Sequence, residues 1–388
     1  MMWDIPLSEL EYGPEEERAV LEVLHSRWLT MGERTATFEE AFAELAGTRH
    51  AVAVANCTVA LHLALLGVGV GPGDEVIVPD LTFIAGVNAV RYTGAVPVLA
   101  DVTSPQDLTI SPADVEAKIT PRTKAVMVMH YGGYPCNMDA VHRIAQAHGL
   151  AVVEDGAHAP GAEYRGRPAG SLGDVAAFSF FSNKNMASGE GGMLTTNDEE
   201  IARAARLMRS HGMTAQTLDR HKGHAHSYDV VLLGYNYRLT EIEAALAAVQ
   251  LRKLAEFNQA RAQLVEYYRA FLAGVPGVEI PFSGFGEPDQ WPFPARSSHH
   301  LMVILLPDDE VRGRVIEGLR EHRIQSSIHY PPAHSFSNIQ EEARSGRVRI
   351  DGLETVESVA PRILTLPLSP SYGQPVAERV AEVIQASL

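Results

Sequence analysis

Lys184 is the residue of this sequence best placed to act as a nucleophilic amine. It follows the apolar run Phe178–Phe181 and precedes the glycine-dense stretch Gly189–Gly192. An amine at the end of a buried strand can lose its proton and attack an aldehyde, so Lys184 is a candidate Schiff-base lysine. The chain contains only five lysines against 27 arginines, so this placement is not a by-product of abundant lysine.

Asp155 is the second candidate for chemistry, because it ends an apolar strand predicted over Leu150–Val153. A buried carboxylate needs a cation or several hydrogen-bond donors to stay charged, and a protonated pyridine nitrogen would serve. An aspartate at a strand end can equally cap a following helix. Both interpretations are open on this motif alone.

The turn Asn56-Cys57-Thr58 joins a predicted strand to a predicted helix and is a candidate phosphate site. The first turn of a helix has unpaired backbone N–H groups that attract anions, although such turns are also common structural features. Ser179 is a second candidate phosphate donor, five residues before Lys184. That odd spacing would place the two side chains on opposite faces of a regular strand, so a bend before Lys184 is predicted.

Phe83 follows a predicted strand end and could either stack on a flat ring or pack in the core. An amine, a carboxylate for a ring nitrogen, a phosphate cup and a stacking aromatic are together the groups that pyridoxal phosphate requires. The combination therefore predicts pyridoxal 5′-phosphate as the cofactor.

The elements that must position these residues alternate between short apolar runs and helix-like segments. This alternation predicts an α/β fold with a mainly parallel sheet, in which ligands gather at the carboxyl ends of the strands. The predicted strands are 52–55, 76–78, 96–100, 125–129, 150–153 and 176–181, and the helical segments between them include 59–66, 138–147 and 199–208.

A long amphipathic helix over 239–272 is predicted to bridge two domains. After a loop rich in Pro and Gly, a strand (300–306), a helix (309–322), a strand (324–329) and a final helix predict a smaller α+β unit. We expect a large cofactor-binding domain over 1–255 and a small C-terminal domain over 256–388. About 25 N-terminal residues are expected to pack on the small domain.

The composition excludes several classes of partner. A net charge of −16 over 388 residues disfavours nucleic acid and anionic membrane surfaces. No apolar run is long enough for a membrane span, and the N-terminus lacks a signal-peptide pattern, so we expect a cytoplasmic protein. Two cysteines are too few for a disulfide framework, and the histidines His221, His224 and His226 are interpreted as a polar loop rather than a metal site.

The order of these motifs resembles the pyridoxal-phosphate sugar aminotransferases of the DegT/DnrJ/EryC1/StrS family, which have fold type I. That resemblance implies a central, mainly parallel sheet with helices on both faces and a smaller C-terminal α+β domain. It runs nearly end to end and is carried by Leu29–Gly32, Gly73–Pro79, Thr82-Phe83, Glu154-Asp155, Ser179–Lys184, Gly189–Gly192, Gly234–Arg238 and His329–His334.

The resemblance implies a role for each matching position. Lys184 is similar to the Schiff-base lysine and proton shuttle, and Asp155 to the partner of the pyridinium nitrogen. The cofactor is expected to contact His158 at its phenolic oxygen and Phe83 at its ring face. The other matches are Cys57, Thr58 and Ser179 in the phosphate cup, Asn236 reaching the phosphate of a neighbouring subunit, and Asn185, His329 and Tyr330 at the substrate end.

The implied reaction moves an amino group from glutamate or glutamine to a keto-sugar in amino-sugar, antibiotic or other natural-product biosynthesis. The segment Gly234–Arg238 is closer to relatives that act at C4, which favours a nucleotide-linked 4-keto-6-deoxyhexose. A cyclitol ketone of the scyllo-inosose type is the alternative substrate. A non-catalytic regulator of the same fold is a further alternative, although it would not need Lys184, Asp155 and a phosphate cup. A homodimer with shared active sites is also implied.

One departure from the family pattern bears on the cofactor. Relatives commonly have Ser-Gly-Thr where this chain has Asn56-Cys57-Thr58. The glycine that lets the backbone approach a phosphate is absent, so we expect weaker rather than lost phosphate binding at Cys57.

Overall fold

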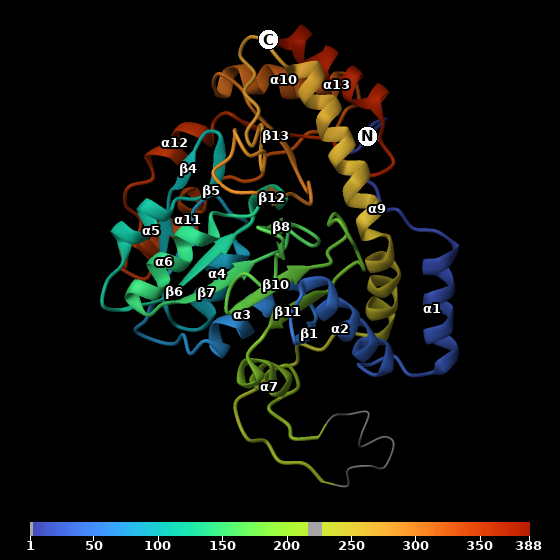
Figure 1. Cartoon of the computed structure of the whole chain (residues 1–388), viewed down its shortest axis with the longest axis vertical. Coiled ribbons are helices and arrows are strands. Elements are labelled where there is room, and N and C mark those ends of the chain that lie inside the picture. The colour runs from blue at the N-terminus through green and yellow to red at the C-terminus, as the bar shows by residue number, and fades with distance from the viewer. Residues whose placement is uncertain (1–2, 216–226) are drawn as a thin grey trace.

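A computed structural model describes residues 3–215 and 227–388 of the chain. Its centre is a seven-stranded sheet in the order β1-β11-β10-β7-β6-β2-β3, in which β11 runs opposite to the other six strands (Figure 1). The mainly parallel sheet predicted from the alternating pattern is therefore confirmed. The strands are β1 His50–Val54, β2 Glu75–Pro79, β3 Val96–Ala100, β6 Thr123–Met129, β7 Ala151–Asp155, β10 Val175–Ser179 and β11 Gly192–Thr196.

Helices cover both faces of this sheet, so both are buried. Successive side chains of a strand point to opposite sides and therefore belong to different cores. In β2, Val76 and Val78 belong to one core cluster and Ile77 to another. The first face packs on α3 (Cys57–Gly67), α4 (Ala85–Tyr92) and α7 (Glu199–Met208). The second face packs on α2 (Glu33–Ala46), α5 (Pro112–Lys118), α6 (Met138–His148) and α9 (Glu241–Leu272). The helices predicted over 59–66, 138–147 and 199–208 are α3, α6 and α7.

The C-terminal unit has its own core around a two-stranded antiparallel sheet of β13 (Met302–Leu305) and β14 (Ile363–Leu366). The strand predicted over 324–329 is wrong, since this segment makes only isolated bridges at Ile324 and Ser327. The partner of β13 is instead β14, which the sequence did not reveal. The helices of this part of the chain are α10 Asp309–Glu321, α11 Ser337–Arg344, α12 Glu354–Val359 and α13 Gln374–Ser387.

The remaining short elements lie around the edges of the two cores. They are α1 Pro14–Ser26, β4 Val102–Ser104, β5 Asp107–Ile110, β8 Glu163–Tyr164, β9 Arg167–Pro168 and β12 Ala295–Arg296. α1 packs along the N-terminal half of α9, whereas Ile5 enters the C-terminal core beside Ile324 (Figure 1). The expected domain boundary at residue 255 falls inside α9, and we propose that this one helix serves both units.

Two general expectations can be compared with the described residues. None of the helices they form is long and apolar enough to cross a membrane. They also include no group of three or more His, Cys, Asp or Glu side chains placed to hold a metal ion. The histidines His221, His224 and His226 lie outside the described residues.

Candidate active site

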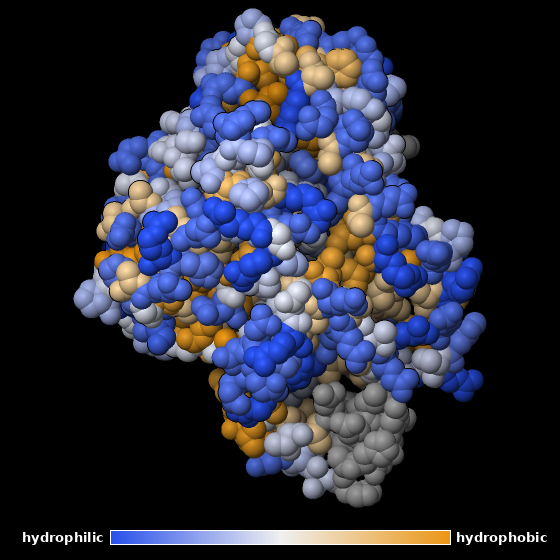
Figure 2. Space-filling model, viewed as in Figure 1, coloured by the Kyte–Doolittle hydropathy of each residue, from blue (hydrophilic) through white to orange (hydrophobic). Residues whose placement is uncertain are grey.

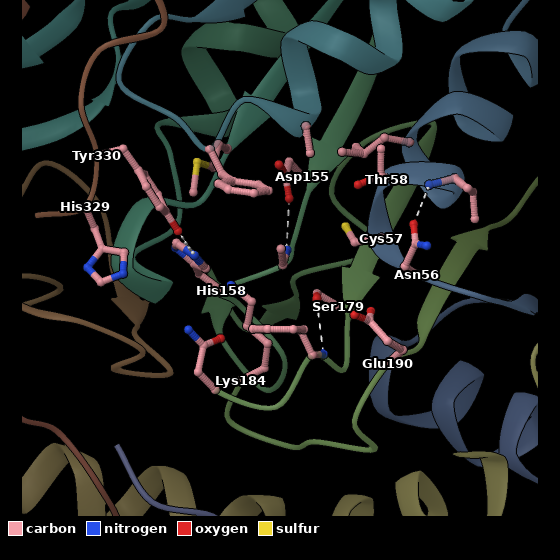
Figure 3. Close-up of a pocket in the computed structure, with 18 of the residues that line it drawn as sticks. Asn56, Cys57, Thr58, Asp155, His158, Ser179, Lys184, Glu190, His329 and Tyr330 are labelled. Atoms are coloured by element: carbon pink, nitrogen blue, oxygen red, sulfur yellow. Dashed lines mark hydrogen bonds between the residues drawn. The ribbon is translucent and has the colours of Figure 1, made fainter. Parts of the chain in front are cut away.

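One cavity of about 740 Å³ lies at the carboxyl ends of the parallel strands. Figure 3 shows the side chains of β7, β10 and the start of α3 meeting there. Its volume lies in the range of ligand-binding pockets. Nine of the residues predicted from the sequence line it: Cys57, Thr58, Phe83, Asp155, His158, Ser179, Lys184, His329 and Tyr330.

Lys184 enters this cavity from an irregular segment that begins where β10 ends at Ser179. Its backbone N–H donates to the carbonyl of Phe181 at 2.9 Å, which is the bend that the spacing between Ser179 and Lys184 predicted. Burial lowers the pKa of the Lys184 amine to about 8, against the opposing influence of Asp155 and Cys57. The neutral, nucleophilic form of this amine is therefore far more populated near neutral pH than that of an ordinary lysine.

Asp155 is the last residue of β7, and its side chain is 4% exposed. Burial raises the pKa of this carboxyl, while the Ala157 N–H, which donates to Oδ1 at 3.1 Å, and the Lys184 amine oppose the rise. The segment 156–162 is fully described and contains no helix, so Asp155 is not a helix cap. A buried carboxylate facing a cavity favours a ligand that brings a positive charge.

The predicted phosphate cup forms at the first turn of α3. The Asn56 side chain caps this helix by accepting from the Val59 N–H at 3.1 Å, and the amides of Cys57 and Thr58 lie at the helix start beside the cavity. Cys57 is the first helical residue and does not take a positive φ, so its amide keeps the orientation of a helix N-terminus.

Two neighbouring strands complete this cup. Ser179 Oγ accepts from the Phe181 N–H at 3.3 Å, which leaves its hydroxyl proton for an anion. Gly192 at the start of β11 lies so close to the Asn56–Cys57 backbone that an added Cβ would come within 2.4 Å of the Asn56 carbonyl carbon. A glycine is thus required for the strand to pass behind the cup.

His158 and Tyr330 form the opposite wall. The Gly132 N–H donates to His158 Nδ1 at 3.2 Å, so the proton of this neutral imidazole is on Nε2, which lies 2.9 Å from the Tyr330 hydroxyl. Burial holds the pKa of His158 well below its usual value. Phe83 is 54% exposed, and its ring centre is 5.8 Å from that of Tyr330, so one ring face is open for stacking.

His329 lies beside Tyr330 at the edge of the cavity. Its Nδ1 is 3.0 Å from Thr365 Oγ1 of β14, and burial together with the Lys184 amine lowers its pKa to about 4. It is therefore a neutral hydrogen-bonding group at neutral pH, consistent with its predicted place at the substrate end.

Two predicted residues do not line the cavity. Asn185 is 3% exposed, and its amide is engaged by Asn258, His300 and the Ser298 carbonyl, so we no longer assign it to the substrate. Asn236 is exposed on the isolated chain, where a neighbouring subunit could meet it. Its role across an interface stays a prediction.

Sequence reasoning missed several lining residues, among them Asn183, Glu190 and Tyr237. Each neighbours a motif that was singled out, because Glu190 lies within Gly189–Gly192 and Tyr237 follows Asn236. No sequence signal identified His300, which approaches Lys184 from a segment 116 residues away.

The residues present fit pyridoxal phosphate. The amine of Lys184 suits the aldehyde, the buried carboxyl of Asp155 suits a protonated ring nitrogen, and the start of α3 suits the phosphate. Phe83 and His158 remain for the ring face and the phenolic oxygen.

Comparisons with known proteins agree with this fit. The model of a family described as the DegT/DnrJ/EryC1/StrS aminotransferase family matches residues 11–385. The spore coat polysaccharide biosynthesis protein SpsC of Bacillus subtilis (strain 168) is 39% identical over 386 residues, covering 98% of this chain and 96% of SpsC.

Solved structures give the same result. DesV of S. venezuelae is 35% identical with a TM-score of 0.86, covering 98% of both chains. The PLP form of the putative sugar aminotransferase Spr1654 from Streptococcus pneumoniae is 26% identical with a TM-score of 0.89, covering 99% of this chain and 98% of that one. These matches confirm the expected fold-type I architecture.

Proposed function

This chain belongs to the DegT/DnrJ/EryC1/StrS aminotransferase family and uses pyridoxal phosphate, and on that premise we propose that it transfers the amino group of glutamate or glutamine to a keto-sugar. The observation that carries the proposal is the presence of the Lys184 amine and the Asp155 carboxyl in one buried cavity. A non-catalytic regulator or binding protein would not need a lysine whose pKa is lowered to about 8 beside a buried acid.

Each residue then has a defined task. Pyridoxal phosphate, when bound, supplies an aldehyde that accepts amino groups and a protonated ring that withdraws electrons. Lys184 would hold the cofactor through its amine. The same Nζ would then carry the proton that leaves Cα of the amino donor. Asp155 would keep a positive charge on the ring nitrogen, because a cation beside a buried carboxylate stabilises both charges.

The remaining residues hold and shield the reactants. The amides of Cys57 and Thr58 and the hydroxyl of Ser179 bind the phosphate at the helix start. Phe83 covers the ring, and we assign the phenolic oxygen to the side of the cavity where His158 Nε2 meets the Tyr330 hydroxyl.

For the acceptor we propose a nucleotide-linked 4-keto-6-deoxyhexose, used in amino-sugar or antibiotic biosynthesis. Polar side chains such as Asn183 and Glu190 line the cavity together with five aromatic residues, Phe83, Tyr92, Phe181, Tyr237 and Tyr330. Aromatic side chains can pack on the apolar faces of a sugar ring, and the polar side chains can bond its hydroxyl groups. We place the reaction in the cytoplasm, in keeping with the two free cysteines Cys57 and Cys136.

We also propose that two copies of the chain share their active sites. The segment before Asn236 exposes Val230, Val231 and Leu233, the last of them at 80%, and Phe181 at the cavity rim is 45% exposed. Figure 2 shows apolar residues at the lower end of the view, where Figure 1 places α7 and the chain that follows it. An apolar surface of this kind favours a protein partner.

The chemistry is tested by adding pyridoxal phosphate to the purified chain and reducing the adduct with borohydride. We expect a visible absorption band and a covalent adduct on Lys184, both absent in Lys184→Ala. In a separate sample that has not been reduced, glutamate or glutamine should bleach the band. Wild-type protein that stays colourless, or an adduct on another lysine, would contradict the proposal.

The acceptor is tested by restoring that band. A nucleotide-linked 4-keto-6-deoxyhexose and a scyllo-inosose-type cyclitol ketone are each added to bleached enzyme. We expect the sugar to restore the band faster, whereas faster restoration by the cyclitol would replace our assignment.

The dimer is tested by light scattering. The measured mass should be twice that of one chain, and Leu233→Asp should lower the measured mass. A wild-type monomer would refute the shared site.

A further inference from the structure

His300 approaches the reactive lysine from outside the cavity. Its Nε2 is 3.5 Å from Lys184 Nζ, the long end of hydrogen-bond distance, and its side chain is 5% exposed. His300 precedes β13 in the C-terminal part of the chain and is not among the cavity-lining residues. A buried histidine so close to the lysine must present either a proton or a lone pair to it.

A chain of hydrogen bonds decides which of the two it presents. The Pro160 carbonyl can only accept, and Asn258 Nδ2 donates to it at 2.9 Å, so Asn258 Oδ1 faces Asn185. The Ser298 carbonyl likewise accepts from Asn185 Nδ2 at 2.7 Å. Two backbone carbonyls therefore fix the orientation of both amides.

The Asn185 orientation then fixes His300. Asn185 Oδ1 is an acceptor, and it lies 2.8 Å from His300 Nδ1. Nδ1 must carry the proton, because the other tautomer would place two lone pairs against each other in a buried site. Nε2 therefore directs a lone pair at the Lys184 amine, and burial keeps the pKa of His300 well below its usual value, so that the ring stays neutral.

The neighbouring histidine has the opposite tautomer. His158 carries its proton on Nε2, and its ring centre is 4.2 Å from that of His300. Ser298 contacts the surroundings of both histidines. Its carbonyl accepts from Asn185, and its hydroxyl donates to the His158 carbonyl at 2.6 Å. Two neutral imidazoles thus adjoin Lys184 in distinct, fixed states.

We propose that His300 is a positioning residue for Lys184, whose amine donates to the Nε2 lone pair whenever it is not covalently engaged. The inference rests on the proposed role of Lys184 as the reacting amine. It assigns the Asn185, Asn258 and Ser298 groups to holding His300 rather than to binding substrate. Since α9 supplies Asn258, the long helix connects the C-terminal segment to the catalytic lysine.

The proposal has a consequence for the proton affinity of Lys184. An ammonium donates a stronger hydrogen bond than a neutral amine, so a lone pair at His300 favours the charged form. Removing that lone pair should lower the pKa of the amine further. The other charged or titratable groups that influence either residue are Cys57, Asp155, His158, Arg261 and His329.

The test compares His300→Asn with His300→Gln. The asparagine amide can donate to Asn185 from near the position of Nδ1, but it is too short to accept from Lys184. The glutamine amide oxygen can lie near the position of Nε2 and accept from the lysine. The pH dependence of reductive methylation at Lys184 is measured by mass spectrometry on cofactor-free protein. The exposed Lys124 serves as the internal reference, and thermal unfolding checks that each variant folds.

We expect the Lys184 midpoint to fall by about one pH unit in His300→Asn and to stay near wild type in His300→Gln. In the cofactor-bound enzyme, kcat should fall about tenfold in His300→Asn with little change in KM. The proposal would be overturned if the wild type and both variants had the same Lys184 midpoint. It would also be overturned if the midpoint shifted equally in His300→Asn and His300→Gln.

If His300→Asn fails to fold, Asn258→Ala removes one anchor without touching the lysine. A smaller shift in the same direction is expected, and an unchanged midpoint would count against the proposal. These titrations need neither cofactor nor sugar. A failure here is therefore distinguishable from a failure of the proposed aminotransfer.

Discussion

The hydroxyl oxygen of Tyr330 lies 2.9 Å from Nε2 of His158, across 172 residues of sequence. His158 follows the end of β7 in the central sheet, and Tyr330 comes directly after the segment 324–329 that was expected to form a strand. This contact builds one wall of the cavity from both parts of the chain, so the C-terminal part completes the site that the sheet begins.

Replacing Tyr330 with Phe should destabilise the chain, because the Nε2 proton of buried His158 loses its acceptor. An unsatisfied buried donor costs about 1–3 kcal/mol. We expect the free energy of unfolding from urea titration to fall by that amount. In the double variant His158→Gln with Tyr330→Phe, the added loss of unfolding free energy should be smaller than the sum of the two single losses. Additive losses would mean that the two side chains do not interact.

Asp155→Asn should affect stability and activity in opposite directions. Burial disfavours the charged carboxylate in the cofactor-free chain, so an amide of the same size should leave the unfolding temperature unchanged or raise it. Aminotransfer should fall by about 10²-fold or more, because the ring nitrogen loses its charged partner. Scanning calorimetry and single-turnover absorbance measure the two effects. Activity within twofold of wild type would refute the assigned role.

The buried Asp80 and His334 form a pair at 2.6 Å, and the hydrogen bond to this carboxylate raises the pKa of His334 above 6.5. A base whose pKa is raised by folding stabilises the chain fully below its unfolded pKa, and that contribution is lost as the pH rises through the folded value. His334→Gln should therefore cost more unfolding free energy at pH 6 than at pH 8.5. Urea titrations at both values test this, and equal costs would mean that His334 does not titrate with folding.

Cys57→Gly should restore the family's usual residue at the phosphate cup. Removing the side chain beside the cavity is expected to tighten pyridoxal phosphate binding several-fold, while glycine in the first turn of α3 lowers stability by about 1 kcal/mol. Cys57→Ala is the control that keeps the Cβ atom. Equal tightening in both variants would assign the effect to the thiol, and unchanged affinity in both would contradict the prediction.

Much of the sheet could be predicted because its strands are short apolar runs buried on both faces. The runs around 76–78 and 125–129 are rich in β-branched residues and are bounded by turn or helix signals, which favours buried strands. β14 could not be recognised in this way, because Ile363–Leu366 gains its identity from pairing with β13, which lies far from it in the sequence. The neighbouring segment 324–329 looked as strand-like but has no continuous partner.

Local sequence by itself determined the chemistry that β7, β10 and α3 bring to the cavity, because strand ends and helix starts place Asp155, Ser179, Cys57 and Thr58 through geometry a few residues long. Only the tertiary structure decided how Lys184 is surrounded. His300 reaches it from 116 residues away, and Asn258 bonds the adjacent Asn185 from 73 residues away. Carbonyls of Pro160 and Ser298 set the proton positions in this network. Such a network depends on distances and directions between segments, and no periodicity in the chain encodes them.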